Sequence, residues 1–398
     1  MFLNTLIRRN GDFIRAAAKL HQEKLIPSNC YVLDLDTIEK NIDILIEEAN
    51  RLKLTLFPMT KQINRNPDVL DLFGKKGIID YVAVDINEAR VISKLGKSIG
   101  HLGHLVQVPA MHTDFAARIK PKYWTVFTNK KASAAAKASH QIGHTQPLLA
   151  RIHSDGDIFY RGHEGGFDLG DIVEIANMIN NMDGAAFSGI TTFPTLLFDE
   201  SKKKVLPTPN LSTLQRAADM LSKSGINDIQ INAPGTTSST VMHILAQAGA
   251  TQVEPGHAIT GTTPLHALED LPEIPAMLYL SEVSHCDNEM AYCYGGGLYI
   301  DPVFSDYKVH ALYGSSEDEI LENMTECEMP APVAIDYYGR LYNNQRRKCA
   351  EGDTVIFCFR AQAFVTRAYV ASVRGASTGT PEVLGIYNSE GDKAQWLP

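Results

Sequence analysis

Lys61 ends the apolar run of "FPMTKQINRNP" (57–67), an unexpected position because lysine is among the residues least often buried. A lysine whose amine is desolvated can lose its proton and form a Schiff base with a carbonyl compound. The alternative is a surface lysine whose aliphatic stem lies along apolar side chains while its amine reaches water. This stretch alone leaves both interpretations open.

Two further stretches carry polar groups of a complementary kind. In "NAPGTTSST" (232–240), Gly235 precedes a run of hydroxyl side chains at the expected start of a helix, where exposed N–H groups can bind phosphate. Those hydroxyls belong to Thr236, Thr237, Ser238 and Ser239. Glu254 ends another apolar run, "ATQVE". Taken singly, the first stretch also fits an ordinary helix cap and the second a solvated carboxylate.

Together these groups match the needs of pyridoxal phosphate (PLP). A lysine can hold the aldehyde, a cradle of hydroxyl and N–H groups can hold the phosphate, and a carboxylate can pair with the pyridine nitrogen. The three stretches together are stronger evidence than any one of them alone, and they predict PLP as the cofactor.

The elements that must position these residues follow a β-strand and α-helix rhythm. A (β/α)8 barrel is predicted, because eight β-type runs alternate with helical stretches. The runs are "LTLFPM" (54–59), "DYVAVD" (80–85), "HLVQV" (104–108), "YWTVF" (123–127), "PLLARIH" (147–153), "FSGITTF" (187–193), "DIQIN" (228–232) and "ATQVE" (250–254). Barrel enzymes carry their active sites at the carboxyl ends of the strands, where all three stretches fall. The competing architecture is a doubly wound open sheet, which is weakened because no G-x-G-x-x-G follows the first strand.

The rhythm ends near residue 264 and gives way to β-type runs with turn residues, such as "AMLYLSEVSH" and "AFVTRAYVASVRG". The fold class is therefore α/β, with a PLP-carrying barrel and a C-terminal all-β domain. We expect an N-terminal helix over 1–27, the barrel over 28–270 and the β-domain over 271–398.

The amino-acid composition limits the classes of function that the chain can have. The chain has 398 residues and a formal charge of −9, so it lacks the basic character typical of nucleic-acid binding. Its 6 cysteines form no C-x-x-C pair, which fits a reducing cytoplasm. No apolar run approaches the ~20 residues of a membrane span, and the first residues lack the pattern of a targeting peptide. We expect a cytoplasmic protein with a small-molecule substrate, without nucleic-acid or membrane partners.

The chain resembles the alanine racemase superfamily of PLP-dependent enzymes, and within it the YhfX-type proteins. The resemblance covers about residues 28–398 and is carried by "YVLDLDTIEKNI", "LTLFPMTK", "DYVAVDINEA", "GITTF", "NAPGTTSS" and "EPG". It implies a barrel plus a β-domain, amino-acid metabolism, and a homodimer whose sites borrow residues from the partner subunit.

The resemblance also implies roles for individual residues. Lys61 matches the lysine that binds PLP, and Glu254 matches the strand-8 residue that faces the pyridine nitrogen. The phosphate site falls on Asn232, Gly235, Thr236, Thr237 and Ser238, and the strand that lines the cofactor carries Arg151 and His153.

The departures from the family pattern separate possible reactions. Alanine racemases place arginine where Glu254 stands, whereas basic amino-acid decarboxylases of the same fold carry a similar "EPG". A carboxylate keeps the pyridine nitrogen protonated and so makes the ring a stronger electron sink. The racemases' tyrosine proton donor has its nearest counterpart in Tyr294, which could also be a core tyrosine of the β-domain. D-threonine aldolases and D-serine dehydratases bind metal through a His-x-Cys, which appears here as Gln362 and Phe364, so we expect no metal.

Three functions remain open from the sequence. The first is an amino-acid racemase, with Lys61 and Tyr294 as catalytic residues. The second is a PLP-dependent decarboxylase or D-amino-acid lyase. The third is a non-catalytic PLP-binding protein, against which the β-domain counts, because the barrel-only carriers of the superfamily lack one.

Overall fold

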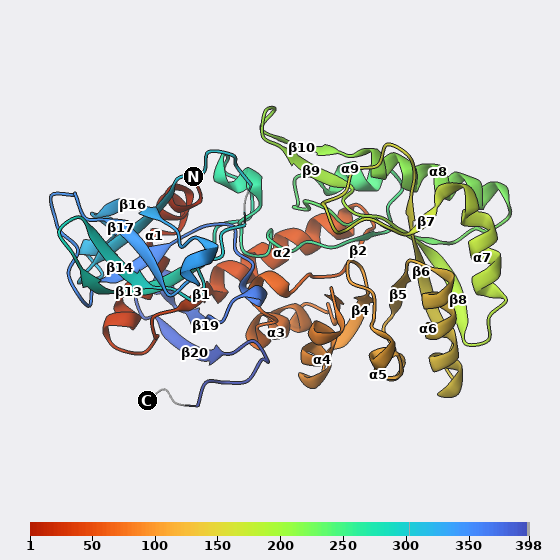
Figure 1. Ribbon diagram of the computed structural model, residues 1–398, viewed down its shortest axis with the longest axis horizontal. Coiled ribbons are helices and arrows are strands. Elements are labelled where there is room, and N and C mark those ends of the chain that lie inside the picture. The colour runs from red at the N-terminus through yellow and green to blue at the C-terminus, as the bar shows by residue number, and fades with distance from the viewer. Residues whose placement is uncertain (302, 396–398) are drawn as a thin grey trace. The chain divides into compact units, whose positions relative to one another are not determined.

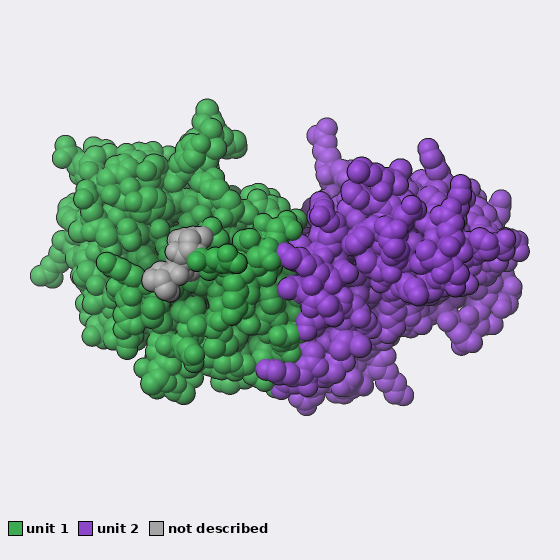
Figure 2. All heavy atoms as spheres, turned by 90° about the horizontal axis from the view of Figure 1, so that it is seen from below, with its two compact units in different colours: residues 1–44, 62–72, 257–398 green, residues 45–61, 73–256 purple. Residues whose placement is uncertain are grey.

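The computed structural model describes residues 1–301 and 303–395, which form two compact units (Figures 1 and 2). Unit 1 contains residues 1–44, 62–72 and 257–398, and unit 2 contains residues 45–61 and 73–256. The domain boundaries after residues 27 and 270 stay a prediction. Within unit 1, β1 (Cys30–Asp34) pairs with β13 and β19.

Unit 2 holds the parallel sheet, in the order β2-β12-β11-β8-β6-β5-β4-β3. The sheet closes because Met59, just beyond β2, pairs in parallel with Val82 of β3, and the Val82 N–H donates to the Pro58 carbonyl at 3.0 Å. The predicted (β/α)8 barrel is confirmed. Its strands are β2 (Thr55–Leu56), β3 (Asp80–Ala83), β4 (Ser98–Leu102), β5 (Tyr123–Val126), β6 (Gln146–His153), β8 (Ala185–Thr191), β11 (Gln230–Asn232) and β12 (Gln252–Val253), with β7 (Phe167–Asp168) beside β6.

The third barrel strand was predicted in the wrong place. We placed it at 104–108, whereas β4 occupies Ser98–Leu102. Position 100 within β4 requires glycine, because a Cβ atom there would meet the Phe57 ring at 2.6 Å. Gly103 then takes a φ of +81°, and the chain leaves the sheet before the more apolar "HLVQV".

Helices alternate with the strands of unit 2, as Figure 1 shows for α4 to α8. The helices in the described part of the chain are α1 (Phe2–Gln22), α2 (Leu35–Arg51), α3 (Pro67–Lys75), α4 (Ile86–Lys94), α5 (Thr113–Arg118), α6 (Asn129–Gln141), α7 (Ile172–Asn180), α8 (Pro209–Lys223) and α9 (Met242–Gln247). A hairpin of β9 (Leu196–Asp199) and β10 (Lys204–Pro207) follows β8. Among residues 1–301 and 303–395, no helix has both the length and the apolar character of a membrane span.

Unit 1 is built on a largely antiparallel sheet in the order β14-β17-β16-β15-β18-β13-β1-β19-β20. Because β13 also pairs with β14, the first part of this sheet closes into a β-barrel. The predicted C-terminal all-β domain is confirmed, although the charged and turn-rich stretches of β16 and β17 had not been predicted as strands. The strands are β13 (Met277–Cys286), β14 (Met290–Tyr294), β15 (Val309–Gly314), β16 (Met324–Glu328), β17 (Tyr338–Tyr342), β18 (Thr354–Phe357), β19 (Tyr369–Arg374) and β20 (Glu382–Tyr387).

Candidate active site

The barrel brings the three predicted stretches to one end of unit 2. Lys61 follows β2, Asn232 ends β11, and Glu254 follows β12 directly. Since the strands are parallel neighbours, their carboxyl ends meet at the same rim. This is the rim at which (β/α)8 enzymes carry their active sites.

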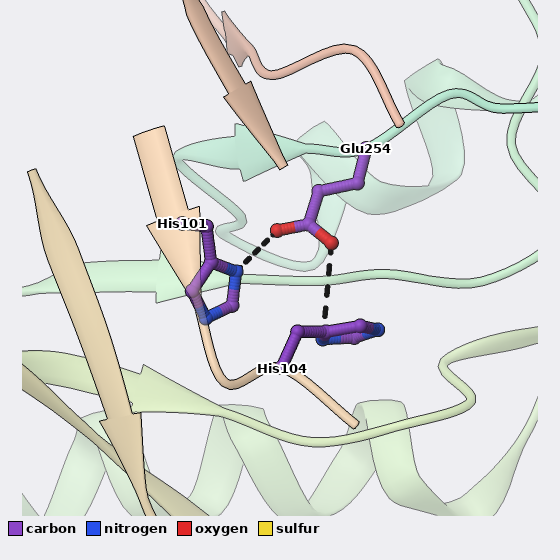
Figure 3. Close-up of side chains that lie close together, drawn as sticks. All are labelled: His101, His104 and Glu254. Carbon is purple, nitrogen blue, oxygen red and sulfur yellow. Dashed lines mark hydrogen bonds and ion pairs between the residues drawn. The ribbon is translucent and has the colours of Figure 1, made fainter. Parts of the chain in front are cut away.

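Glu254 is wholly buried; in the described chain only its Oε1 accepts hydrogen bonds, while its Oε2 lies in ion-pair range of His104 (Figure 3). Its Oε1 accepts hydrogen bonds from Nδ1 of His101 at 2.5 Å and from Nδ2 of Asn232 at 2.8 Å. Asn232 is fixed in turn, because its Oδ1 accepts from Thr191 Oγ1 at 2.8 Å. Within the described chain, Oε2 of Glu254 has no hydrogen-bond partner. One side of the carboxylate is therefore clamped and the other is left open.

The electrostatics keep this buried carboxylate ionised. Burial raises the pKa of Glu254, but His101 and the hydrogen bonds from His101 and Asn232 outweigh burial and hold the pKa below its ordinary value. His104 cannot supply charge at neutral pH, because burial lowers its own pKa to about 3. The donors on Oε1 are therefore the groups that stabilise the charged form.

His104 lies on the open side of Glu254, with Nδ1 3.7 Å from Oε2 (Figure 3). Neither of its ring nitrogens is hydrogen-bonded to any residue that the structure describes. Its ring packs edge-on against Phe193, with 5.3 Å between centroids. A neutral imidazole with two unused nitrogens thus stands beside the open carboxylate oxygen.

Arg151 is buried to 1% exposure and ties together the loops around the site. Its guanidinium donates to the carbonyls of His163 at 2.5 Å and of His104 and Phe193 at 3.5 Å each. It also lies 4.7 Å from the centre of the Phe127 ring. Burial lowers the pKa of Arg151 to about 10, so it stays protonated at neutral pH. It is a fixed positive charge at this rim.

Lys61 is half-buried at the start of a 3-10 turn, Lys61–Ile63. Burial is the main cause of the lowered pKa of His104 and of His163, and the charge of Lys61 is a smaller cause of both. Lys61 therefore lies within electrostatic range of the loop residues next to Glu254 and Arg151. Asn64 and Arg65, both at a φ of +54°, follow this turn.

The loop after β11 is built differently from our expectation. A Cβ atom on Gly235 would meet the backbone N of Leu196 at 2.6 Å, so Gly235 is needed for the close approach of the β9 segment. The Thr236 N–H donates to the Leu196 carbonyl at 3.0 Å, and the Thr195 N–H donates to the Pro234 carbonyl at 2.9 Å. Thr237 and Ser238 are buried in the loop ahead of α9, which begins only at Met242.

Two further predicted site residues are His153 in unit 2 and Tyr294 in unit 1. His153 is half-buried at the end of β6, two residues beyond Arg151, and no hydrogen bond joins it to the other candidates in the described chain. Tyr294 ends β14 in unit 1, where 37% of it is exposed. It lines a cavity of about 610 Å³ together with Tyr338, Arg340 and Arg367. Tyr294 is therefore not a core tyrosine.

His101 and His104 were not assigned a role from the sequence. In the structure, one possible ligand atom from each of His101, His104 and Glu254 lies within 4.8 Å of the others. Had the third strand been placed at Ser98–Leu102, His101 would have been recognised near the carboxyl end of a barrel strand.

In this structure His101 and Glu254 are hydrogen-bonded to each other, and the absence of a metal stays a prediction. Two ligands about 2.0–2.1 Å from a tetrahedral zinc ion lie about 3.3 Å apart, whereas His101 Nδ1 and Glu254 Oε1 are 2.5 Å apart. The other ring nitrogen of His101 is bonded to Thr125 Oγ1 at 2.5 Å. In unit 1, Gln362 donates to Asp301 at 2.7 Å.

Comparisons with known proteins agree with this architecture. The model of the alanine racemase N-terminal domain matches residues 33–264, and the model of the YhfX-like C-terminal domain matches residues 278–383. The protein YhfX of Escherichia coli strain K12 is 41% identical over 392 residues, which cover 98% of this chain and 99% of YhfX.

Solved structures share the fold at low sequence identity. D-threonine aldolase from Filomicrobium marinum matches with a TM-score of 0.70 and 16% identity, over 92% of this chain and 96% of that chain. Alanine racemase of Clostridium difficile 630 in complex with cycloserine matches at 0.65 and 13%, over 92% and 99%. D-threo-3-hydroxyaspartate dehydratase from Delftia sp. HT23 matches at 0.62 and 14%, over 90% and 97%. Proteins of this fold thus include a racemase, an aldolase and a dehydratase.

Proposed function

Because this chain belongs to the alanine racemase family, with an alanine racemase N-terminal domain and a YhfX-like C-terminal domain, we propose that it is a PLP-dependent amino-acid racemase. The observation that carries the PLP dependence in this proposal is the buried, ionised carboxylate of Glu254, whose Oε2 has no hydrogen-bond partner in the described chain. When bound, PLP supplies an electron sink for the negative charge that develops at the α-carbon of an amino acid.

The residues at the rim fit this cofactor. The open oxygen of Glu254 suits the protonated pyridine nitrogen, because an ionised buried acceptor needs a donor to satisfy it. Lys61 is the lysine at the end of a barrel strand that can hold the aldehyde carbon.

The loop after β11 is the part we assign to the phosphate. Its hydroxyls belong to Thr236, Thr237 and Ser238, and Asn232 and Gly235 shape the loop. Arg151 and His153 lie on the strand that we assign to the cofactor's flank.

Racemisation requires proton transfer on both faces of the α-carbon. We assign one face to the Nζ of Lys61, which takes or returns the proton of Cα. We assign the other face to the hydroxyl of Tyr294 from a second copy of the chain, so that the active form is a homodimer. The exposure of Tyr294 and the cavity beside it support this assignment.

A decarboxylase or D-amino-acid lyase is the second candidate. Glu254 favours it, because a carboxylate makes the cofactor a stronger electron sink than an arginine would. The lyase is disfavoured because Gln362 and Phe364 stand where the resemblance places metal ligands in such enzymes, and Gln362 is already bonded to Asp301. We accordingly propose an enzyme that needs no metal. A non-catalytic PLP carrier is disfavoured by the β-domain.

One experiment separates these functions. The protein is incubated with a panel of L- and D-amino acids in deuterated water, and both enantiomers are analysed. Racemisation gives α-deuterium in both enantiomers of the substrate. Stoichiometric carbon dioxide, ammonia or aldehyde would favour the second candidate, and cofactor binding without any exchange would favour the carrier.

A further inference from the structure

The geometry around Glu254 points to a role for a residue that neither the family pattern nor the sequence singled out. We propose that His101 is a positioning residue for Glu254, whose Nδ1–H clamps Oε1 so that Oε2 alone is presented to the ligand. The proposal rests on the proposed function, because it assigns the ligand group that Oε2 meets as a protonated ring nitrogen.

The hydrogen bonds of His101 leave its orientation little freedom. Nδ1 lies 2.5 Å from Glu254 Oε1, and Nε2 lies 2.5 Å from Oγ1 of Thr125 on the neighbouring strand β5. His101 and Thr125 are both fully buried. An ionised carboxylate can only accept, so Nδ1 must carry a proton, and Thr125 serves Nε2 in either protonation state of the ring. The chain Thr125–His101–Glu254 therefore fixes which ring nitrogen donates to Glu254.

The two carboxylate oxygens of Glu254 differ in the number of hydrogen bonds they accept. Oε1 receives two donors, from His101 and Asn232, while Oε2 receives none within residues 1–301 and 303–395. Without His101, Asn232 alone would hold Oε1, and the carboxylate could turn about its own axis. The charged form would also lose one of its two hydrogen bonds, and its affinity for a proton would rise.

His104 provides a natural contrast. It is also a fully buried histidine near Glu254, but its Nδ1 is 3.7 Å from Oε2 and neither ring nitrogen has a hydrogen-bond partner in the described chain. The titratable groups that act on Glu254 are His101 on β4 and His104 after β4, while Lys61 after β2 and Arg151 on β6 act on His104. If proximity alone mattered, replacing either histidine would have the same effect.

The test uses two amide substitutions that divide the functions of the imidazole. In His101→Asn the amide nitrogen takes the place of Nδ1 and keeps the donor to Glu254. In His101→Gln the amide nitrogen takes the place of Nε2 and keeps the contact with Thr125 only. His104→Asn is the matched control, and Thr125→Val is a second variant that loosens the ring if His101→Gln fails to fold.

The first readout is the 13C carboxyl signal of Glu254 in the cofactor-free protein, assigned by its loss in Glu254→Gln and followed with falling pH. We expect wild type, His101→Asn and His104→Asn to stay ionised down to acid unfolding. In His101→Gln, Glu254 should take up its proton at a pH at least one unit higher than in wild type, a tenfold change in proton affinity. In Thr125→Val, the Glu254 titration should shift less, in the same direction. Equal titration of His101→Gln and wild type would overturn the proposal.

The second readout is the 15N signal of the pyridine nitrogen in labelled PLP bound to each variant. We expect a protonated nitrogen in wild type and His101→Asn, and a lower protonated fraction in His101→Gln. An unchanged fraction in His101→Gln would also contradict the proposal. Failure of wild type to bind PLP would instead overturn the proposed function, while the cofactor-free titration would still decide the role of His101.

Discussion

The carboxylate of Glu254 accepts a hydrogen bond from Nδ1 of His101 at 2.5 Å, and both side chains are fully buried. This pair joins the carboxyl end of β12 to that of β4 across the barrel. It stabilises a charge in a place where burial alone would favour the protonated acid. A buried charge with one unsatisfied oxygen is costly unless a ligand completes it.

The first prediction concerns this charge. In Glu254→Gln, α-proton exchange should fall at least about tenfold, because a neutral amide no longer raises the pKa of the pyridine nitrogen. Affinity for PLP, measured by fluorescence titration, should change much less, since the assigned lysine and phosphate contacts remain.

The matched control is Glu88→Gln. Glu88 is also a buried barrel glutamate, and its Oε2 accepts from the Val84 N–H at 2.8 Å, a bond that glutamine can keep. Exchange should be unaffected in this variant. If Glu254→Gln exchanged as fast as wild type, Glu254 would have no part in the chemistry.

The second prediction concerns the loop after β11. Gly235→Ala should lower stability by about 1–3 kcal/mol, because the new methyl group meets the Leu196 backbone and forces the loop and the β9 segment apart. PLP affinity should fall as well, since the hydroxyls assigned to the phosphate lie in the same loop. Urea unfolding and cofactor titration measure both effects.

Gly74→Ala in α3 is the control, because a Cβ atom there meets nothing within 4 Å. It should be neutral or slightly stabilising, because Gly74 is helical, in the last turn of α3, and alanine costs less backbone entropy than glycine. Equal stability of the two variants would contradict the packing that we assign to Gly235.

Much of this site could be predicted from the sequence, because strand ends in a barrel converge wherever the rhythm of elements is correct. Lys61 and Glu254 were found in this way, since each directly follows a recognisable apolar run. His101 was missed because β4 contains Gly100 and polar residues, while the next five residues have the stronger β-pattern. The strand is fixed by its pairing with β3 and β5, and Gly100 is the residue that lets it lie against the Phe57 ring.

Long-range pairing accounts for the other differences. The "CYVLD" strand at Cys30–Asp34 was expected in the barrel domain, and no local pattern indicates that it pairs with Met277–Leu280 and with β19. The role of Gly235 was likewise inferred from loop chemistry alone. The partner that requires a glycine there is Leu196, which is remote in the sequence.

The third prediction concerns pH and stability. His104 has a pKa of about 3 in the folded protein, mainly through burial, and about 6.5 when unfolded. Between these values the unfolded chain binds a proton that the folded chain does not, so stability falls as pH falls through this window. His104→Phe should remove about 1–2 kcal/mol of the loss between pH 7 and pH 5.

The measurement compares thermal unfolding of the cofactor-free wild type and His104→Phe at both pH values. Other charges that face His104 are present in both proteins, namely Lys61, His101, Arg151 and Glu254. His21 in unit 1, with a pKa of about 4 through burial, contributes a loss of the same sign and should persist. An identical pH dependence in the two proteins would mean that His104 protonates while folded.

The fourth prediction concerns the second face of the α-carbon. Tyr294→Phe should slow deuterium exchange from one enantiomer by about 10²-fold or more, and from the other far less, because only one face loses its proton donor. Tyr338→Phe is the control, since Tyr338 pairs with Tyr294 and is similarly exposed. Equal slowing of both enantiomers would argue against a role for Tyr294 on a single face.

The most direct test of the account is to locate the lysine that holds PLP. The purified protein should be yellow, and borohydride reduction followed by peptide mapping should place the pyridoxyl group on Lys61. Lys122→Ala, which removes a surface lysine paired with Asp80, should leave that labelling intact, whereas Lys61→Ala should abolish it. A pyridoxyl group on any other lysine, or none at all after incubation with PLP, would contradict the proposed site and the function that we derive from it.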